Sequence, residues 1–375
     1  MYCNKISRKK RNLIKIFGGL NCGSYDTQKN RRECNDIIRK HLAISQRHIK
    51  MNIDNKFIKF NDLLIFIEKL TGQGKYGKAY LSTLKYKNQS YDIIIKQQIV
   101  NNKSKELLVN KELQIIQYLS SLVENNVSPH FLHYYNDIST NIISLSSQPT
   151  ATNTINNFNE YIKTFIVEKA SGVFSELINT KIHSDFNSII SQIIISIYTF
   201  HQYTKCYHCD THRNNFLYHE LIQEQKTYIK YKLDNNIYKL KLSNYLIILW
   251  DYGLALPIKN TSILSPYEFT YMIFDYHRIF NIIYNYCNNN AENQDKIDKI
   301  LNILEDYDEK LLNITRKHND HKIKVKYMFQ LEKEMIYTLI KENLLFATND
   351  IFSKDYIPYN AIPYDLENTA NYKTI

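Results

Sequence analysis

Glycine, proline and tryptophan are scarce in this chain, which has 8 Gly, 6 Pro and 1 Trp among its 375 residues. Such low counts exclude collagen-like repeats, glycine-rich linkers and proline-rich segments. Long apolar runs are missing as well, because no stretch of about 18 uncharged apolar residues occurs, and we expect no membrane span. The apolar stretch from Leu13 to Phe17 is interrupted by Lys15 and is too short for the core of a signal peptide.

Cysteine is neither abundant nor regularly spaced. The six cysteines are scattered along the chain, at Cys3, Cys22, Cys34, Cys206, Cys209 and Cys287. This distribution does not resemble a disulfide framework, which in small secreted domains is dense. We therefore expect an intracellular, reducing compartment and a cytoplasmic location.

The composition is that of a globular protein. Hydrophobic residues make up 44% of the chain, charged residues 23% and aromatic residues 13%. This content is enough to bury a sizeable core, and it excludes intrinsic disorder for most of the chain. The length allows one large domain or two modest ones.

Positive charge is concentrated at the start of the chain. The net charge is +11, and residues 1–50 contain thirteen Lys or Arg against three Asp or Glu. We expect residues 1–60 to form a basic N-terminal extension on a nearly neutral body. Such an extension suggests contact with nucleic acid, an anionic surface or an acidic partner, and the simpler alternative is a solvated, mobile arm.

Three glycines are grouped at the spacing G-x-G-x-x-G, at Gly72, Gly74 and Gly77. Without a Cβ atom, the backbone amides of such a loop can approach phosphate oxygens. A P-loop would end in Gly-Lys-Ser or Gly-Lys-Thr, but here Lys78 is followed by Ala79. A dinucleotide-binding loop would open a helix, whereas residues 80–86 and 91–96 have the pattern of two strands. The spacing therefore predicts a glycine loop between strands.

A lysine closes the second of these strands. Lys96 follows three consecutive isoleucines, which favours a charge pointing into a cleft over a solvated strand end. The apolar residues from 106 to 122 recur at helical spacing. We expect an acidic residue on the inner face of this helix to pair with Lys96. Glu112 is the first choice and Glu106 the alternative, although either could be solvated.

Residues 207–217 carry the strongest motif. They follow an apolar helix predicted over 186–201, and they contain His-x-Asp with an asparagine five residues after the aspartate. The aspartate is Asp210, whose carboxylate could accept or orient the proton of an attacking hydroxyl. The asparagine is Asn215, whose amide oxygen suits a hard cation such as Mg²⁺. A third motif follows, in which a hydrophobic strand over 247–249 leads to Asp-Tyr-Gly at Asp251.

The same segment allows a different interpretation. Cys206-x-x-Cys209, beside His208 and His212, could form a metal site or a redox pair. A zinc site would need a second pair of ligands at suitable spacing, and Cys287 alone does not supply it.

The glycine loop, the strand lysine, His-x-Asp with its asparagine and Asp-Tyr-Gly occur in the order found in the protein kinase superfamily. The chain resembles this superfamily over residues 66–345, and in particular the divergent serine/threonine kinase-like proteins of large DNA viruses. The resemblance implies an α+β, bilobal protein-kinase-like fold with a small β-rich N-lobe and a larger, mostly α-helical C-lobe. It also implies ATP and Mg²⁺ as cofactors and a host-cytoplasmic or virion location.

The resemblance assigns roles to individual residues. Asp210 would be the catalytic aspartate, with Lys96 and His212 as its catalytic partners, and Asn215 and Asp251 would bind the metal. Val167 would occupy the gatekeeper position. The nucleotide would be bound by Gly72, Gly74, Gly77, Ala79, Ile94, Lys96, Glu112, Glu168, Ala170 and Leu217. Ala79 and Ile94 exchange the larger and smaller residues that the family usually has at these positions.

Two departures leave the substrate class open. Cys209 replaces the arginine common before the catalytic aspartate, which makes control by phosphorylation of an activation loop doubtful. His212 stands where protein kinases usually have a lysine, and histidine there is the pattern of aminoglycoside and choline kinases. The expected function is a serine/threonine protein kinase. The alternatives are a small-molecule kinase and a non-catalytic pseudokinase scaffold.

The resemblance also divides the chain. We expect an N-lobe over 61–169, a C-lobe over 170–345 and a C-terminal tail over 346–375 that forms an extended strap. A β-hairpin insertion near 218–246 would separate Asn215 from Asp251. The segment after Gly253 is short, with about twenty residues before a helix over 271–280. In that helix Asp275 resembles the buried aspartate that supports the catalytic loop, and its alternative is a carboxylate on the helix surface.

Overall fold

A computed structural model of the chain provides the structure. It describes residues 28–44, 49–52, 57–60, 63–74, 77–86, 89–141, 160–180, 182–221, 228–234, 236–241, 244–258, 270–287, 290–317, 321–346 and 364–365. Several expectations lie outside these residues. They concern the first part of the basic extension (1–27), part of the insertion (222–227), the segment after Gly253 (259–269) and most of the tail.

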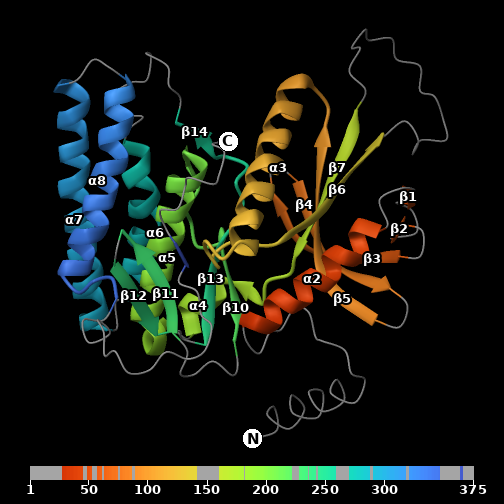
Figure 1. Cartoon of the computed structure of the whole chain (residues 1–375), viewed down its shortest axis with the longest axis horizontal. Helices are drawn as coiled ribbons and strands as arrows, with labels where there is room; N and C mark the ends of the chain where they lie inside the picture. Colours follow the sequence, from red (N-terminus) through yellow and green to blue (C-terminus); the bar gives the residue numbers. More distant parts are fainter. Residues whose placement is uncertain are drawn as a thin grey trace, which may run out of the picture. The chain divides into compact units, whose positions relative to one another are not determined.

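The chain forms two compact units, each described here by itself. Unit 1 comprises residues 1–113 and 133–169, and unit 2 comprises 114–132 and 170–375. Unit 1 is rich in strands, whereas long helices dominate unit 2 (Figure 1). The expectation of an α+β fold with a β-rich part and a mostly helical part is confirmed.

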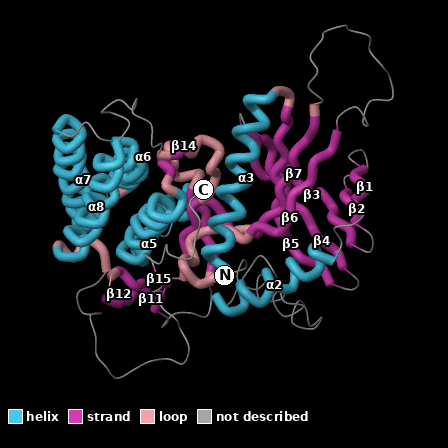
Figure 2. Tube along the Cα trace, turned by 45° about the horizontal axis from the view of Figure 1, so that its top comes forward, coloured by secondary structure: helices cyan, strands magenta, loops and turns pink. Residues whose placement is uncertain are grey.

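Unit 1 is built on a seven-stranded sheet in the order β1-β2-β3-β4-β5-β7-β6, with antiparallel neighbours (Figure 2). Its elements are α2 (Gln28–Ile44), β1 (Ile49–Asn52), β2 (Phe57–Phe60), β3 (Leu63–Gly74), β4 (Gly77–Tyr86), β5 (Gln89–Val100), the first turns of α3 (Lys103–Glu124), β6 (Tyr134–Asn141) and β7 (Tyr161–Glu168). The predicted strands and the predicted helix over 106–122 are present, each somewhat longer than its sequence pattern.

The two faces of strand β5 carry different kinds of side chain. Ile93 and Ile95 are fully buried, and Ile94, Lys96 and Gln98 lie on the opposite face because side chains alternate along a strand. The apolar residues belong to the core of unit 1. The second face presents the polar groups from which a site can be built.

Helix α2 belongs to the basic N-terminal extension, but it is packed against the sheet through contacts with β6. Its buried residues recur every three or four positions, as on one helix face: Arg31, Cys34, Asn35, Ile38 and Leu42. Arg32, Glu33 and Asp36 are exposed. This part of the extension is therefore integrated into the fold of unit 1 and is not a solvated arm.

Unit 2 is organised around the helix α5 (Ile182–Thr204), which packs on strand β13. The six apolar side chains predicted to face the core are all fully buried, and they are Ile189, Ile190, Ile193, Ile194, Ile197 and Phe200. The other elements are β8 (Gly172–Val173), α4 (Phe174–Thr180), β9 (Cys206–Tyr207), β10 (Phe216–Glu220), β11 (Tyr228–Leu233), β12 (Asn236–Lys241), β13 (Tyr245–Leu249), β14 (Leu256–Pro257), α6 (Tyr271–Tyr286), α7 (Ala291–Lys317), α8 (His321–Lys341) and β15 (Tyr364–Asp365).

The predicted hairpin between Asn215 and Asp251 is the antiparallel pair β11–β12. In the tail, Tyr364 and Asp365 form β15, which pairs in parallel with β11. Helices α7 and α8 run side by side in unit 2 (Figure 1). None of the helices described is both long and apolar enough to cross a membrane.

The cysteines of the described residues differ in state. Cys206, Cys209 and Cys287 are free thiols. Cys34 is disulfide-bonded, which is an exception to the expectation that the cysteines remain reduced.

Candidate active site

In unit 1, the register of the sheet places several predicted nucleotide-binding residues in one row. Gly72 on β3 is opposite Ala79 on β4, and Ala79 is opposite Lys96 on β5. Directly paired residues point to the same face of a sheet, and Ile94 shares that face because it lies two residues before Lys96. Four residues from three consecutive strands are therefore brought onto one surface.

The glycine loop is the end of the β3–β4 hairpin, as predicted. Gly74 is paired with Gly77, and the two residues between them lie outside the described part of the chain. At Gly77 the absence of a side chain is a steric requirement, because a Cβ atom would collide with the carbonyl oxygen of Gln97 on β5. At Gly72 a Cβ atom would lie at an ordinary 3.8 Å from the Cβ of Ala79.

Lys96 forms a buried ion pair with Glu112 of α3. The distance from Lys96 Nζ to Glu112 Oε1 is 2.6 Å, and the second carboxylate oxygen accepts a hydrogen bond from Gln98 Nε2 at 2.7 Å. Glu106, the alternative partner, instead contacts Lys103 at 3.0 Å and Tyr161, which together lower its pKa. Of the two glutamates considered, Glu112 is the one that pairs with Lys96.

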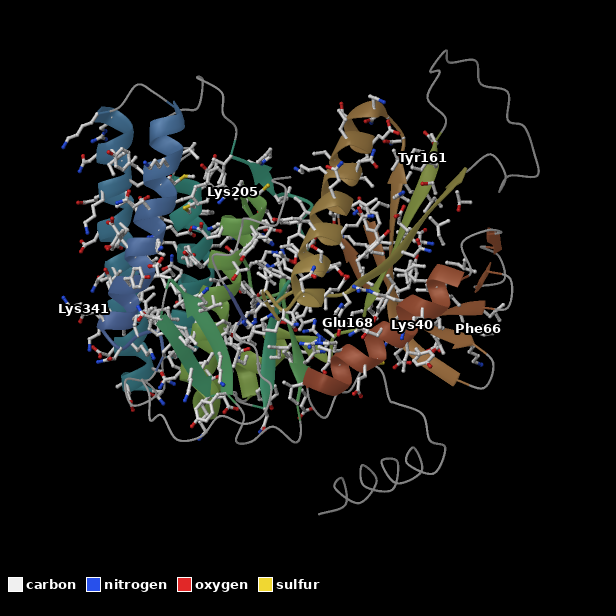
Figure 3. All side chains as sticks on the ribbon, viewed as in Figure 1. Lys40, Phe66, Tyr161, Glu168, Lys205 and Lys341 are labelled. Carbon is white, nitrogen blue, oxygen red and sulfur yellow. The ribbon has the colours of Figure 1, made fainter. Side chains whose placement is uncertain are left out.

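At the end of β7, Val167 at the predicted gatekeeper position and its neighbour Glu168 are also buried. Val167, paired with Ile94 on β5, is fully buried. The side chain of Glu168 is fully buried too, and it accepts hydrogen bonds from Arg31, Asn35 and the backbone N–H of His133. Figure 3 shows Glu168 beside the ribbon of α2. Any contact of Glu168 with a nucleotide must therefore come from its backbone.

In unit 2, Asp275 of α6 binds the backbone of the loop between β9 and β10. One carboxylate oxygen of Asp275 accepts the N–H of His208 at 2.7 Å, and the other accepts the N–H of Cys209 at 2.8 Å. Its backbone carbonyl accepts the hydroxyl of Thr211. Asp275 is completely buried, so the structure excludes the surface position considered as an alternative.

Asp275 is itself supported by a buried chain of charges. His201 on α5 contacts Asp275 Oδ2 through Nε2 at 3.0 Å and Glu332 Oε1 through Nδ1 at 2.6 Å. Tyr276 and Gln202 also donate to Glu332, at 2.8 and 2.9 Å. Burial alone would lower the pKa of His201, but the charge of Glu332 and the contacts with Asp275 raise it to about 9. The imidazole is thus a cation between two carboxylates.

Asp210 is held through both of its carboxylate oxygens. Oδ1 is 2.9 Å from Arg278 Nη2, and Oδ2 accepts a hydrogen bond from Asn215 Nδ2 at 2.9 Å. His212 Nε2 lies 3.4 Å from the same Oδ2. Burial would raise the pKa of Asp210, but the hydrogen bond and charge of His212, the charge of Arg278 and the amide of Asn215 together lower it. Asp210 is therefore an anion at neutral pH.

The predicted metal-binding residues lie at the same end of the β10–β13 pair. Asn215 precedes β10 and Asp251 follows β13, and the backbone N–H of Trp250 bonds the carbonyl of Asn215 at 2.8 Å. The hydrogen bonds from the Asn215 side chain to the carbonyl and the carboxylate of Asp210 both use its amide nitrogen, so they do not engage its amide oxygen. An amide oxygen and a carboxylate are the hard ligands that Mg²⁺ prefers, so the donor set fits that ion.

The rival interpretation of the cysteines finds no support in the geometry. Within the described residues, no group of three or more His, Cys, Asp or Glu side chains is arranged to hold a metal ion. The thiol of Cys206 contacts the carbonyl of Thr204. Burial lowers the pKa of His208, and its ring nitrogens contact the carbonyl of Trp250 and the N–H of Asp210. His208 is therefore a neutral structural residue.

The remaining predicted residues lie beside this centre. Leu217 is on β10, paired with Ile248 and Val173, two residues after Asn215. Ala170 directly precedes Ser171, whose N–H bonds the carbonyl of Tyr218 on β10.

Several residues of these networks were not identified from the sequence, among them Arg31, Gln98, Arg278 and Glu332. Two of them had a detectable signal, because Gln98 lies two residues after Lys96 on a strand and Arg278 lies three residues after Asp275 on a helix. No local pattern identifies Arg31 or Glu332.

Comparison with known proteins gives a distant match to a kinase. No protein-family model matches the sequence. The chain is 24% identical over 195 residues to the probable serine/threonine-protein kinase 380R of Invertebrate iridescent virus 6, a match that covers 50% of this chain and 36% of that protein. The matched region thus spans only about a third of the viral protein's length.

Solved structures give a weaker likeness. A crystal structure of a kinase domain covers 56% of this chain, and 58% of that domain is covered, with 14% identity and a TM-score of 0.33. A TM-score this low carries no weight by itself. The curated match and the ordered motifs agree, however, and they identify the chain as kinase-like: it resembles the protein kinase superfamily, and within it the divergent serine/threonine kinase-like proteins of large DNA viruses.

Proposed function

We propose that the chain is an ATP- and Mg²⁺-dependent phosphotransferase, and specifically a serine/threonine protein kinase. The observation that carries the proposal is the arrangement around Asp210. An anionic carboxylate is fixed through both oxygens, and the neighbouring Asn215 bonds it through its amide nitrogen, a bond that does not engage the amide oxygen proposed to bind the cation. A phosphotransferase needs these two functions, orientation of a hydroxyl and ligation of a metal, at adjacent positions.

Each residue then has a role in transfer. Asp210 orients the substrate hydroxyl and takes up its proton, while Asn215 and Asp251 hold the metal. Lys96, kept in place by Glu112, binds nucleotide phosphates together with the amides of the loop that contains Gly77. Bound Mg²⁺ supplies the charge that neutralises the phosphate oxygens during transfer. The predicted residues Ala79 on β4, Ile94 on β5 and Leu217 on β10 also contact the nucleotide.

Burial supports the role of Lys96. A lysine ammonium in a low-dielectric environment is stable only when it is paired, and Glu112 provides that pair. A purely structural strand would achieve the same stability with an apolar residue. The presence of a buried charged pair at this position on β5 is therefore better explained by phosphate binding.

A small-molecule kinase is the second candidate, because His212 lies 3.4 Å from Asp210. Histidine at this place resembles the aminoglycoside and choline kinase pattern. A non-catalytic scaffold is a weaker candidate, since it would need neither the anionic Asp210 nor the amide of Asn215 beside it. Nothing in the comparisons supports a nucleic-acid partner for the basic extension, and Arg31 of that extension is buried in an ion pair.

The protein substrate, its serine or threonine hydroxyl and a location in host cytoplasm or virion all belong to this proposal. The test is transfer of labelled γ-phosphate from Mg-ATP to a mixed protein substrate, with an Asp210→Asn variant in parallel. Label on protein that disappears in the variant supports a protein kinase. ATP turnover without labelled protein favours the small-molecule kinase, and nucleotide binding without turnover favours the scaffold.

A further inference from the structure

Arg278 is a residue of α6 that contacts the loop of Asp210 at two points. Its Nη2 lies 2.9 Å from Asp210 Oδ1, and its Nη1 donates a hydrogen bond to the carbonyl oxygen of Cys209 at 3.0 Å. The guanidinium group therefore spans a backbone carbonyl and the adjacent side-chain carboxylate. The planar, permanently charged fork of arginine suits two such acceptors, whereas a lysine ammonium acts as a point charge.

Arg278 and Asp275 together hold Cys209 from both sides. They are three residues apart and therefore on the same face of α6. Asp275 accepts the N–H of Cys209 at 2.8 Å, while Arg278 donates to its carbonyl. Cys209 has a φ of 62°, a left-handed conformation that is unfavourable for a residue other than glycine. Bonds on both polar groups of the residue maintain that conformation and set the direction in which Asp210 leaves the backbone.

The carboxylate of Asp210 is fixed from two independent directions. Asn215 and His212 come from the loop itself and contact Oδ2, whereas Arg278 comes from a helix and contacts Oδ1. Without Arg278, the loop contacts on Oδ2 would remain, but Oδ1 would lose its partner. The carboxylate could then rotate about χ2, a torsion with broad preferences in aspartate.

We propose that Arg278 is a positioning residue that fixes the orientation of Asp210 toward the substrate hydroxyl. The proposal rests on the phosphotransferase function proposed above. Because Arg278 acts on Asp210 and not on the nucleotide-binding strands, its loss should lower kcat and leave the KM for Mg-ATP unchanged. The Arg278 side chain is 34% exposed, so a small guanidinium compound can reach the site when the side chain is removed.

The experiment compares Arg278→Ala and Arg278→Lys with Arg316→Ala, which removes an exposed arginine of α7 in the same unit. A hydrogen bond to a charged group supports an expected loss of about 10- to 100-fold in kcat for Arg278→Ala, with KM for Mg-ATP within about twofold. Added methylguanidine should restore part of the kcat of Arg278→Ala. Methylguanidine should restore less of the kcat of Arg278→Lys than of Arg278→Ala. The kcat of Arg316→Ala should equal that of the wild type.

A second readout does not depend on activity. Amide hydrogen exchange in peptides covering residues 206–216 should be faster in Arg278→Ala than in either the wild type or Arg316→Ala, and methylguanidine should slow it again. If the wild type transfers phosphate and Arg278→Ala has the same kcat, the positioning role of Arg278 is overturned. If the wild type transfers no phosphate, the proposed function fails and exchange alone decides: faster exchange reversed by methylguanidine supports the role of Arg278, and unchanged exchange overturns it.

Discussion

Arg31 and Glu168 form a two-point ion pair across 137 residues of sequence. Nε and Nη2 of Arg31 each lie 2.8 Å from a different carboxylate oxygen of Glu168. Only 3% of the Arg31 side chain is exposed, and the Glu168 side chain is not exposed at all. The contact joins the basic N-terminal extension to the last residue of β7, directly after the predicted gatekeeper position.

Removing Arg31 should destabilise unit 1. Breaking a buried pair leaves an uncompensated charge, and this typically costs about 3–5 kcal/mol of unfolding free energy. We therefore expect urea unfolding of Arg31→Met to occur at clearly lower denaturant concentration than in the wild type. Arg32→Ala, on the exposed side of the same helix, should change the unfolding free energy by less than about 0.5 kcal/mol. Equal stability of the two variants would contradict the structural role of Arg31.

Glu112 and Glu106 should differ in their effect on turnover. Glu112→Gln removes the counter-charge of Lys96, and a charged hydrogen bond of this kind corresponds to about a 10- to 100-fold change in kcat/KM for Mg-ATP. Glu106→Gln is the matched control, because Glu106 contacts Lys103 and Tyr161 instead. Steady-state kinetics of both variants test this prediction, and an equal loss in both would refute the assignment of Glu112.

Gly77 and Gly72 should differ in the cost of an added methyl group. Gly77→Ala forces a Cβ atom against the backbone of β5, and such overpacking typically costs about 1–3 kcal/mol. Gly72→Ala meets only ordinary contact and should unfold close to the wild-type temperature. Thermal denaturation of the two variants measures the difference. Similar melting temperatures would show that β4 and β5 can separate at Gly77 without cost.

The stability of the protein should fall as the pH rises through the pKa of His201. Because this pKa is raised from 6.5 to about 9, protonated His201 stabilises the fold fully below about pH 6.5, and the contribution is lost as the pH passes about 9. The shift corresponds to at most about 3 kcal/mol. Urea unfolding at several pH values between about 6 and 10 measures the slope.

The control for this slope is His201→Gln, which cannot titrate. Lys296 acts in the opposite direction over part of the same range, because burial lowers its pKa to about 8 and stability from this group rises with pH. The informative quantity is therefore the difference in slope between the wild type and His201→Gln. Identical slopes would mean that His201 does not carry a proton between Asp275 and Glu332.

Local patterns predicted the elements and much of the site. The alternation on β5 separates the buried Ile93 and Ile95 from Lys96, and helical periodicity predicted the helix α3 that carries Glu112, the partner of Lys96. These predictions succeed because the period of a strand or helix determines which side chains share a face. The spacing of His-x-Asp and its asparagine similarly brought Asp210 and Asn215 within hydrogen-bonding distance.

Partners from distant elements could not be predicted in this way. The charge count assigned the first fifty residues to an extension, but it could not show that Arg31 would be buried against Glu168. Likewise, the pairing of His201 with Glu332 depends on how α8 packs against α5, which periodicity does not determine. The net charge of a segment indicates that most of its residues are exposed to solvent. It does not show that one arginine of that segment is buried.

The link between His201 and Glu332 also has a consequence for synthesis on the ribosome. The nascent chain emerges from its N-terminus, and 131 positions separate His201 from the carboxylate that completes its surroundings. Until α8 has been translated, the network that supports the loop of Asp210 lacks one of its two anions. Completion of this network therefore depends on synthesis of α8, the last long helix described. A chain released before Glu332 would contain the glycine loop, Lys96, Asp210, Asn215 and Asp251, but it would lack part of the network that supports Asp275.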